Sequence, residues 1–374
     1  MTEHKKIDIV NFFLIWITLG IAFIFPFELF LFSYAVLGPL HYLTEINWLE
    51  KKNYFLKTQT DKKTYLLLVI VALCILSTSF FIPELNKWDI TRTFFLEIEQ
   101  SVIYKPLTGI IAWGNSMLFI GLFSSIVYFI TEKWINRILL FSLCVLISIF
   151  LINYPFFTIF CGVFLPSLIH VFLFTVLFMW SGSKRSNSGW GYVNVISMIL
   201  VVFFIIGKEI PQSSISVSRA TLDTLILSNF HILNFALNKL LGLADNPSWS
   251  LITVSARKAQ IFIAFAYTYH YLNWFSKTSV INWYKVDRKK MGAAIVIWIA
   301  SVILYYINYR LGFAALFVLS ILHVILEFPL NVNSVISLMR PHTQEVKNTK
   351  APLTPATPLI TKKEKKRNTL ASGK

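Results

Sequence analysis

Four histidines lie within long apolar segments of this sequence, where ionisable side chains are rare. They are His41, His170, His270 and His323, and each belongs to a different segment. Neutral imidazole is a common ligand for iron, zinc and copper. An ionisable residue inside a membrane span indicates a functional site, because hydrocarbon penalises charge and unpaired polar groups. The four histidines therefore predict a shared metal site.

A carboxylate follows two of these histidines by four residues, in the pairs His41–Glu45 and His323–Glu327. Residues four apart lie on one face of a helix. A glutamate so placed can bind the metal itself, or it can accept the other ring N–H and orient the imidazole. We expect Glu45 and Glu327 to be catalytic groups that orient ligands or move protons.

The residues around His270 are aromatic and polar, in the order Tyr267-Thr-Tyr-His-Tyr-Leu-Asn-Trp274. Trp and Tyr near the end of a span often anchor it at the membrane interface. The alternative is the wall of a substrate pocket, and its candidate residues are Tyr267, Tyr271 and Asn273.

The segments that must position these side chains are long and apolar. The 374 residues are 56% hydrophobic and 14% charged, whereas an average soluble domain has roughly 25% charged residues. A helix that crosses the hydrocarbon layer needs about 20 apolar residues. Ten segments approach this length, at 9–25, 29–44, 65–82, 107–130, 138–153, 156–180, 193–207, 259–275, 291–308 and 311–328. The sequence predicts an all-α, polytopic transmembrane helix bundle of about ten spans in residues 1–340.

The net charge of +16 is distributed unevenly across this arrangement. With the amino terminus inside, 25 of the 34 Lys and Arg residues fall on the inner side, as expected when basic loops stay in the cytoplasm. We expect an integral protein of the bacterial inner membrane with both termini cytoplasmic, in contact with membrane lipid. Nucleic acid is excluded as a partner, because its recognition needs a basic surface on a folded aqueous domain. The tail at 341–374, with a basic run at 362–367, should be disordered.

Three segments are expected to depart from simple spans. Pro26 and Glu28 interrupt the first apolar run and predict a tight hairpin or a re-entrant segment there. Gly38-Pro39 should break or kink the helix before His41. Residues 221–244 are predicted to form an amphipathic helix that lies on the outer face or is partly buried, and not an eleventh span.

The segment Gly38-Pro-Leu-His41-Tyr-Leu-Thr-Glu45 resembles the early motif of the bacterial Brp/Blh β-carotene dioxygenase family. The resemblance covers about eight residues and the general arrangement of the four histidines, with Leu40 between Pro39 and His41. Members of that family are polytopic and hold a non-haem iron with histidines on several helices. The resemblance implies an iron held by the four imidazoles.

Three functions are compatible with these residues. The first is a membrane non-haem iron oxygenase that acts on a lipophilic substrate. The second is a b-type haem electron carrier, in which two of the histidines bind the haem. The third is a transporter or membrane assembly factor without catalytic activity.

Overall fold

Helices form almost all of the described structure. The computed structural model describes residues 3–212, 217–242, 250–282, 284 and 287–339, and no strand occurs within these ranges. The chain divides into two units, Met1–Val335 and Ile336–Lys374, and the fold and the site described below belong to the first. The predicted disordered tail at 341–374 lies outside the described residues.

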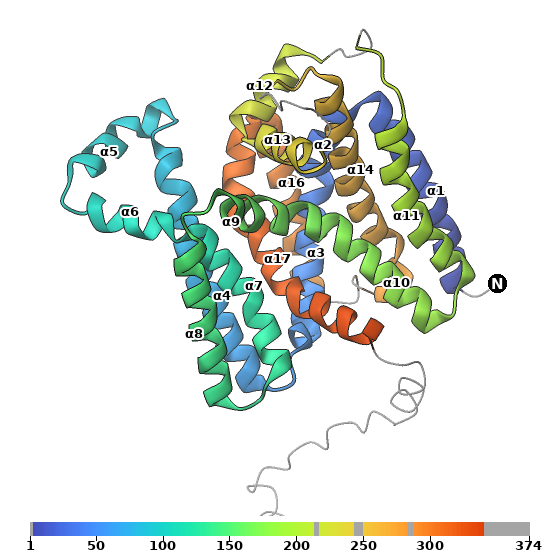
Figure 1. Ribbon diagram of the computed structural model, residues 1–374, viewed down its shortest axis with the longest axis horizontal. Helices are drawn as coiled ribbons and strands as arrows, with labels where there is room; N and C mark the ends of the chain where they lie inside the picture. The colour runs from blue at the N-terminus through green and yellow to red at the C-terminus, as the bar shows by residue number, and fades with distance from the viewer. Residues whose placement is uncertain (1–2, 213–216, 243–249, 283, 285–286, 340–374) are drawn as a thin grey trace, which may run out of the picture. The chain divides into compact units, whose positions relative to one another are not determined.

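The helices follow the predicted segments closely. In chain order they are α1 (Glu3–Ile24), α2 (Pro26–Phe32), η1 (Ser33–Leu37), α3 (Gly38–Lys51), η2 (Asn53–Phe55), α4 (Gln59–Leu85), α5 (Asp89–Gln100), α6 (Tyr104–Ala112), α7 (Gly114–Ile130), α8 (Trp134–Leu151), α9 (Pro155–Ile159), η3 (Phe160–Phe174), α10 (Thr175–Ser186), α11 (Gly189–Gly207), α12 (Arg219–Leu227), α13 (Phe230–Leu240), α14 (Val254–Ser276), α15 (Thr278–Ile281), α16 (Arg288–Ile307) and α17 (Tyr309–Met339). Helices α1, α11 and α14 pack together, helices α4, α7 and α8 form a second group, and α3 and α17 lie between the groups (Figure 1).

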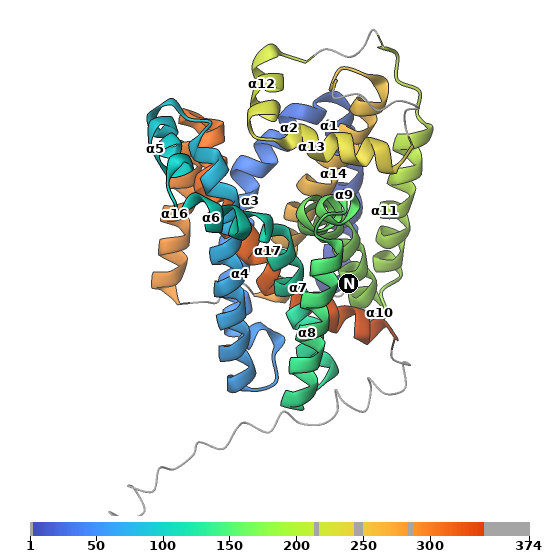
Figure 2. The ribbon, with the colours of Figure 1, turned by 60° about the vertical axis from the view of Figure 1, so that its left-hand side comes forward.

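Eight helical stretches in the described residues are long and apolar enough to cross a membrane, and a ninth is added if α6 and α7, which meet at 44°, are one broken span. The chain is therefore a multi-pass membrane protein. The predicted span at 259–275 forms α14, which is not among these helices. Its composition reflects its position, because 15 of its 23 residues are buried within the protein. Its backbone runs beside that of α1 (Figure 2).

The segment before His41 is irregular, as predicted, but it is not broken. The helix does not break at Gly38-Pro39, since α2, η1 and α3 continue without a gap from Pro26 to Lys51. A proline ring clashes with the carbonyl four residues earlier, and Ala35, which carries that carbonyl, lies in the π-helical segment η1. We infer that the wider π turn accommodates Pro39. Such π turns frequently occur at functional sites.

The predicted helix at 221–244 is also different in the structure. Two short helices, α12 and α13, replace it, and Asn229 separates them with a left-handed φ of 60°. Asn tolerates this conformation better than most residues. At nine and 11 residues, neither helix is long enough to cross the bilayer. Residues 243 and 244 lie outside the described ranges.

Buried carboxylates form ion pairs at both ends of α4. Arg137 at the start of α8 donates to Asp61 in the first turn of α4 at 2.5 Å, and both side chains are buried. At the other end of α4, Glu84 accepts from Lys87 at 2.6 Å and from Arg310 at 2.8 Å. Each carboxylate therefore has a cationic partner, as a buried charge requires.

Pro329 in α17 is accommodated by a side chain from another helix. Because proline has no N–H, the carbonyl of Ile325 loses its normal helical donor. The hydroxyl of Tyr65 on α4 donates to this oxygen at 2.5 Å. The bond joins α4 to α17 two residues from Glu327 and satisfies a backbone group that no water can reach.

We therefore expect Tyr65→Phe to lower the free energy of unfolding in detergent by about 1 kcal/mol, the scale of interhelical hydrogen bonds in membranes. Thermal denaturation measures this change. Tyr306→Phe is the matched control, because the Tyr306 side chain is 92% exposed. Equal stability changes in the two variants would contradict the role assigned to Tyr65.

Candidate metal centre

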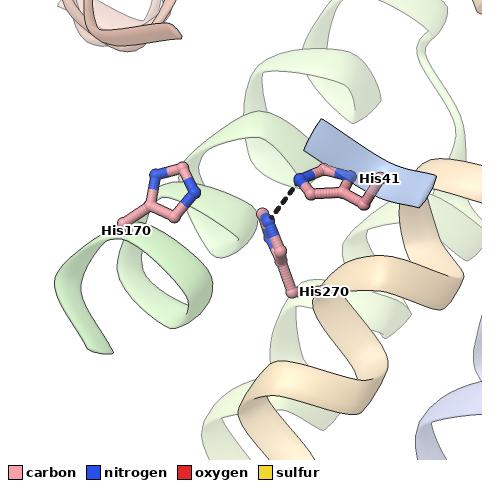
Figure 3. Close-up of side chains that lie close together, drawn as sticks. All are labelled: His41, His170 and His270. Carbon is pink, nitrogen blue, oxygen red and sulfur yellow. Dashed lines mark hydrogen bonds between the residues drawn. The ribbon is translucent and has the colours of Figure 1, made fainter. Parts of the chain in front are cut away.

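Four helices bring the four histidines to one place in the interior. His41 comes from α3, His170 from η3, His270 from α14 and His323 from α17. Each side chain is at most 6% exposed. Figure 3 shows three of them, with the ring of His270 directed toward His41. Residues far apart in the sequence thus form one buried cluster.

The four imidazoles are arranged as a closed ring of neighbours, called here the histidine ring. Nε2 of His41 lies 3.1 Å from Nε2 of His270, and Nε2 of His323 lies 3.2 Å from Nε2 of His170. The ring centroids of the other two neighbouring pairs, His170–His270 and His41–His323, are 5.0 and 5.5 Å apart. The Nε2 atoms in each of the two pairs therefore face one another.

Two buried carboxylates contact the histidine ring. Oε2 of Glu45 lies 3.1 Å from Nε2 of His41, which is the contact expected for residues four apart on one helix. Oε2 of Glu327 lies 3.3 Å from Nδ1 of His170. From the sequence we expected Glu327 to act with His323 on its own helix. In the structure its ion-pair contact is with His170 on η3. Helix packing placed a different imidazole closer to this carboxylate.

Thr175 determines the protonation of His270. Its hydroxyl has one hydrogen, which it donates to the carbonyl of Val171 at 2.9 Å. While the hydroxyl donates to this carbonyl, the Thr175 oxygen can only accept from Nδ1–H of His270, 2.8 Å away. Nε2 of His270 is then left with a free lone pair. In the same way, Glu327 beside Nδ1 of His170 favours a proton on that nitrogen and a lone pair on Nε2.

This donor set fits a metal ion. Metal–imidazole bonds of about 2.0–2.1 Å place neighbouring ligand nitrogens about 2.9–3.4 Å apart, and the facing Nε2 atoms are 3.1 and 3.2 Å apart. Ligand atoms of His41, His170 and His270 lie within 4.8 Å of one another, as do those of His41, Glu45 and His323. A hydrogen-bond partner on Nδ1, as Thr175 is for His270, is typical of metal-binding histidines.

Aromatic side chains enclose the histidine ring. Tyr42 stacks on His323, with centroids 5.2 Å apart, and Trp274 meets His41 edge-on at 5.5 Å. The indole N–H of Trp274 donates to Thr44 at 3.0 Å, which fixes the orientation of its ring. These contacts replace water around the imidazoles with protein.

Two cavities reach different members of the histidine ring. The entrance cavity, about 570 Å³, is lined by His41, Glu45, His270 and Glu327 and continues to Lys52, Arg185 and Lys277. The aromatic cavity, about 580 Å³, is lined by His170 and His323 with Tyr34, Phe230, Phe313 and Phe317. Along α14, Tyr267 lines the aromatic cavity, while Trp274 lines the entrance cavity. The histidine ring therefore lies where the two cavities meet.

The predicted substrate residues are divided between these cavities. Tyr267 and Tyr271 line the aromatic cavity, and Asn273 lines the entrance cavity. Their role in binding a substrate stays a prediction. The remaining histidines lie elsewhere or outside the described residues: His231 is on α13, His4 is at the start of α1 beside the entrance cavity, and His342 is not described.

Sequence reasoning missed three residues of the site. Thr175 and Tyr42 contact the imidazoles, and Lys277 lines the entrance cavity. A hydroxyl in the apolar segment five residues after His170 was the available signal for Thr175. Nothing in the sequence distinguished Tyr42, next to His41, from the other aromatic residues in the spans.

We expect Thr175→Val to lower the affinity of the site for a metal ion about 10–100-fold, as loss of such an indirect partner usually does. Thr175→Ser keeps the acceptor and should restore the affinity. Competition with a chelator of known affinity measures both variants. Unchanged affinity in Thr175→Val would contradict the assignment of the His270 tautomer.

No family model, curated protein or solved structure matches this chain. Its chemistry is therefore inferred from its own residues. Those residues are four buried imidazoles, two buried carboxylates, and two cavities that meet at them.

Proposed function

We propose that this protein is an integral-membrane, metal-dependent oxidoreductase, most specifically a non-haem iron oxygenase that acts on a lipophilic substrate. The observation that carries the proposal is the histidine ring, in which four buried imidazoles from four helices present facing Nε2 atoms. His41, His170, His270 and His323 would hold the iron. Bound iron would supply the redox chemistry of dioxygen activation.

The two carboxylates have different parts in this proposal. Glu327 orients His170 through Nδ1, at 3.3 Å. Glu45 touches the Nε2 atom of His41 and also lines the entrance cavity. It can therefore act as an additional ligand, or it can exchange a proton between the site and that cavity.

The aromatic cavity is the proposed place for the substrate. Tyr34, Phe230 and Phe313 line it and contact one another at centroid distances of 4.8–5.9 Å. An apolar or conjugated molecule is favoured there, because aromatic walls offer a large apolar area and few hydrogen bonds. His170 and His323 form the end of the cavity nearest the proposed iron.

The geometry favours a single ion over a haem. Two axial imidazoles hold a haem iron between them, so their nitrogens are about 4 Å apart at bonds of about 2.0 Å. The facing Nε2 atoms of the histidine ring are 3.1 and 3.2 Å apart. Tyr42 also stacks against His323, where a macrocycle would need open space.

One observation supports the second candidate, a transporter. The entrance and aromatic cavities both reach the histidine ring and are lined by different histidines, as they would be along a transport path. The ring that separates them contains tightly packed, mutually paired side chains. Because the ring separates the two cavities, the arrangement favours a reaction centre that is reached from two sides and disfavours a continuous transport path.

We propose that the chain crosses the membrane ten times with both termini in the cytoplasm, in a bacterial inner membrane. This count takes α6 and α7 as one broken span and adds α14. Fifteen buried residues let α14 cross without a lipid-facing apolar surface. The Lys and Arg bias supports the orientation.

Cysteine labelling in intact cells tests the position of α14. In a variant without the three native cysteines, we expect Ile252→Cys to react with an impermeant maleimide from outside and Tyr284→Cys to react only after the cells are opened. These two residues lie before and after α14. Labelling of both from the same side would show that α14 does not cross.

Metal analysis of the purified protein tests the proposed function. We expect about one iron per wild-type chain and at least a tenfold loss of iron in His270→Ala, because the site loses a ligand from its centre. His231→Ala is the matched control, since His231 lies on α13 away from the histidine ring. Wild-type protein without iron, copper or zinc, or equal losses in the two variants, would overturn the proposal. A Soret band would instead identify the haem alternative.

A further inference from the structure

The entrance cavity changes in chemical character along its length. Its inner end contains the imidazoles of the histidine ring and the carboxylates of Glu45 and Glu327. Its outer end contains three cations, Lys52, Arg185 and Lys277, and one carboxylate, Asp8. The three cations outnumber the single carboxylate, so the charge pattern favours an anion in the outer half.

One stripe of α14 runs through both parts of this cavity. His270, Asn273 and Lys277 are three and four residues apart, which places them on the same helix face. All three line the entrance cavity. At about 1.5 Å per residue, Lys277 is about 10 Å along the axis from His270. The stripe thus presents a proposed metal ligand, an amide and an ammonium in that order.

Two side chains of the outer half, Lys277 and Asn273, have groups without a partner. The ammonium of Lys277 has no hydrogen bond or ion pair in the described part of the chain. Burial lowers the pKa of Lys277 to about 8, and the Asp8 charge opposes this shift. Asn273 is 7% exposed, and its side-chain oxygen has no hydrogen-bond partner. Rotation of this amide would direct its N–H donors into the cavity.

Asp8 is the acidic group nearest these cations, and it is already engaged. Ser188 donates to its carboxylate at 2.5 Å. Its backbone carbonyl accepts from Asn194 at 2.7 Å. Within the described ranges Asp8 forms no ion pair with Lys277, although its charge acts on the ammonium, and an external anion would add a directly bonded partner.

We propose that the outer half of the entrance cavity binds a small anion with a carboxylate or phosphate group, held by Lys277 and Asn273 with Lys52 and Arg185 at the opening. This inference goes beyond the proposed oxygenase function and does not require a bound metal. The anionic group can belong to a soluble molecule or to a lipid headgroup, since both present the same acceptor oxygens to the ammonium.

Calorimetric titration with inorganic phosphate tests this site, with the full chain in nanodiscs of zwitterionic lipid. We expect the wild type to bind phosphate and Lys277→Gln to bind it about tenfold more weakly or worse, because a charge-assisted hydrogen bond is lost. Lys277→Arg should retain binding. Lys63→Gln is the matched control, since Lys63 is an exposed lysine that does not line the cavity. Absence of phosphate binding in the wild type, or an equal loss in Lys63→Gln, would overturn the proposal.

Nanodiscs that also contain an anionic phospholipid distinguish the two sources of the anion. If a headgroup occupies the site, phosphate binding to the wild type weakens in these discs. If the ligand is soluble, phosphate binding is unchanged. Iron content is measured on the same samples, and we expect Lys277→Gln to match the wild type, so a failure of the anion site is distinguishable from a failure of the metal centre.

Discussion

A polar group inside an apolar bundle must find a partner within the protein, and this constraint explains the site of this chain. Imidazole has two ring nitrogens, and water cannot satisfy them in the interior. Four imidazoles that are at most 6% exposed satisfy this requirement in part by facing one another. The atoms that remain without a hydrogen-bond partner, such as Nδ1 of His41 and Nδ1 of His323, indicate that the cluster exists for a ligand and does not serve packing alone.

The same constraint organises the surrounding helices. Pro329 removes a donor from α17, and Tyr65 replaces it from α4. Pro39 and Pro166 each lie in or directly after a π-helical segment, and each is close in sequence to a histidine of the ring. The irregular backbone that these prolines require is buried in the protein, where neighbouring groups can satisfy it. Local irregularity and functional side chains thus occur together.

The sequence predicted the helices well because apolar length and charge distribution are local properties. Each of the ten predicted segments coincides with a helix or with a bent pair of helices. The sequence also predicted which four histidines meet, because ionisable residues are rare in apolar segments and are easily recognised there. The pairing of Glu327 with His170 could not be predicted, because it depends on how η3 packs beside α17. The contact of Thr175 with His270 depends on packing in the same way.

The central claim is that four imidazoles bind one metal ion. X-ray absorption at the metal edge of the purified, metal-loaded protein measures this coordination directly. We expect the first coordination shell of the metal to be dominated by nitrogen at about 2.0–2.1 Å, with outer-shell scattering from about four imidazole rings. A first shell without imidazole scattering, or the scattering pattern of a porphyrin, would contradict it.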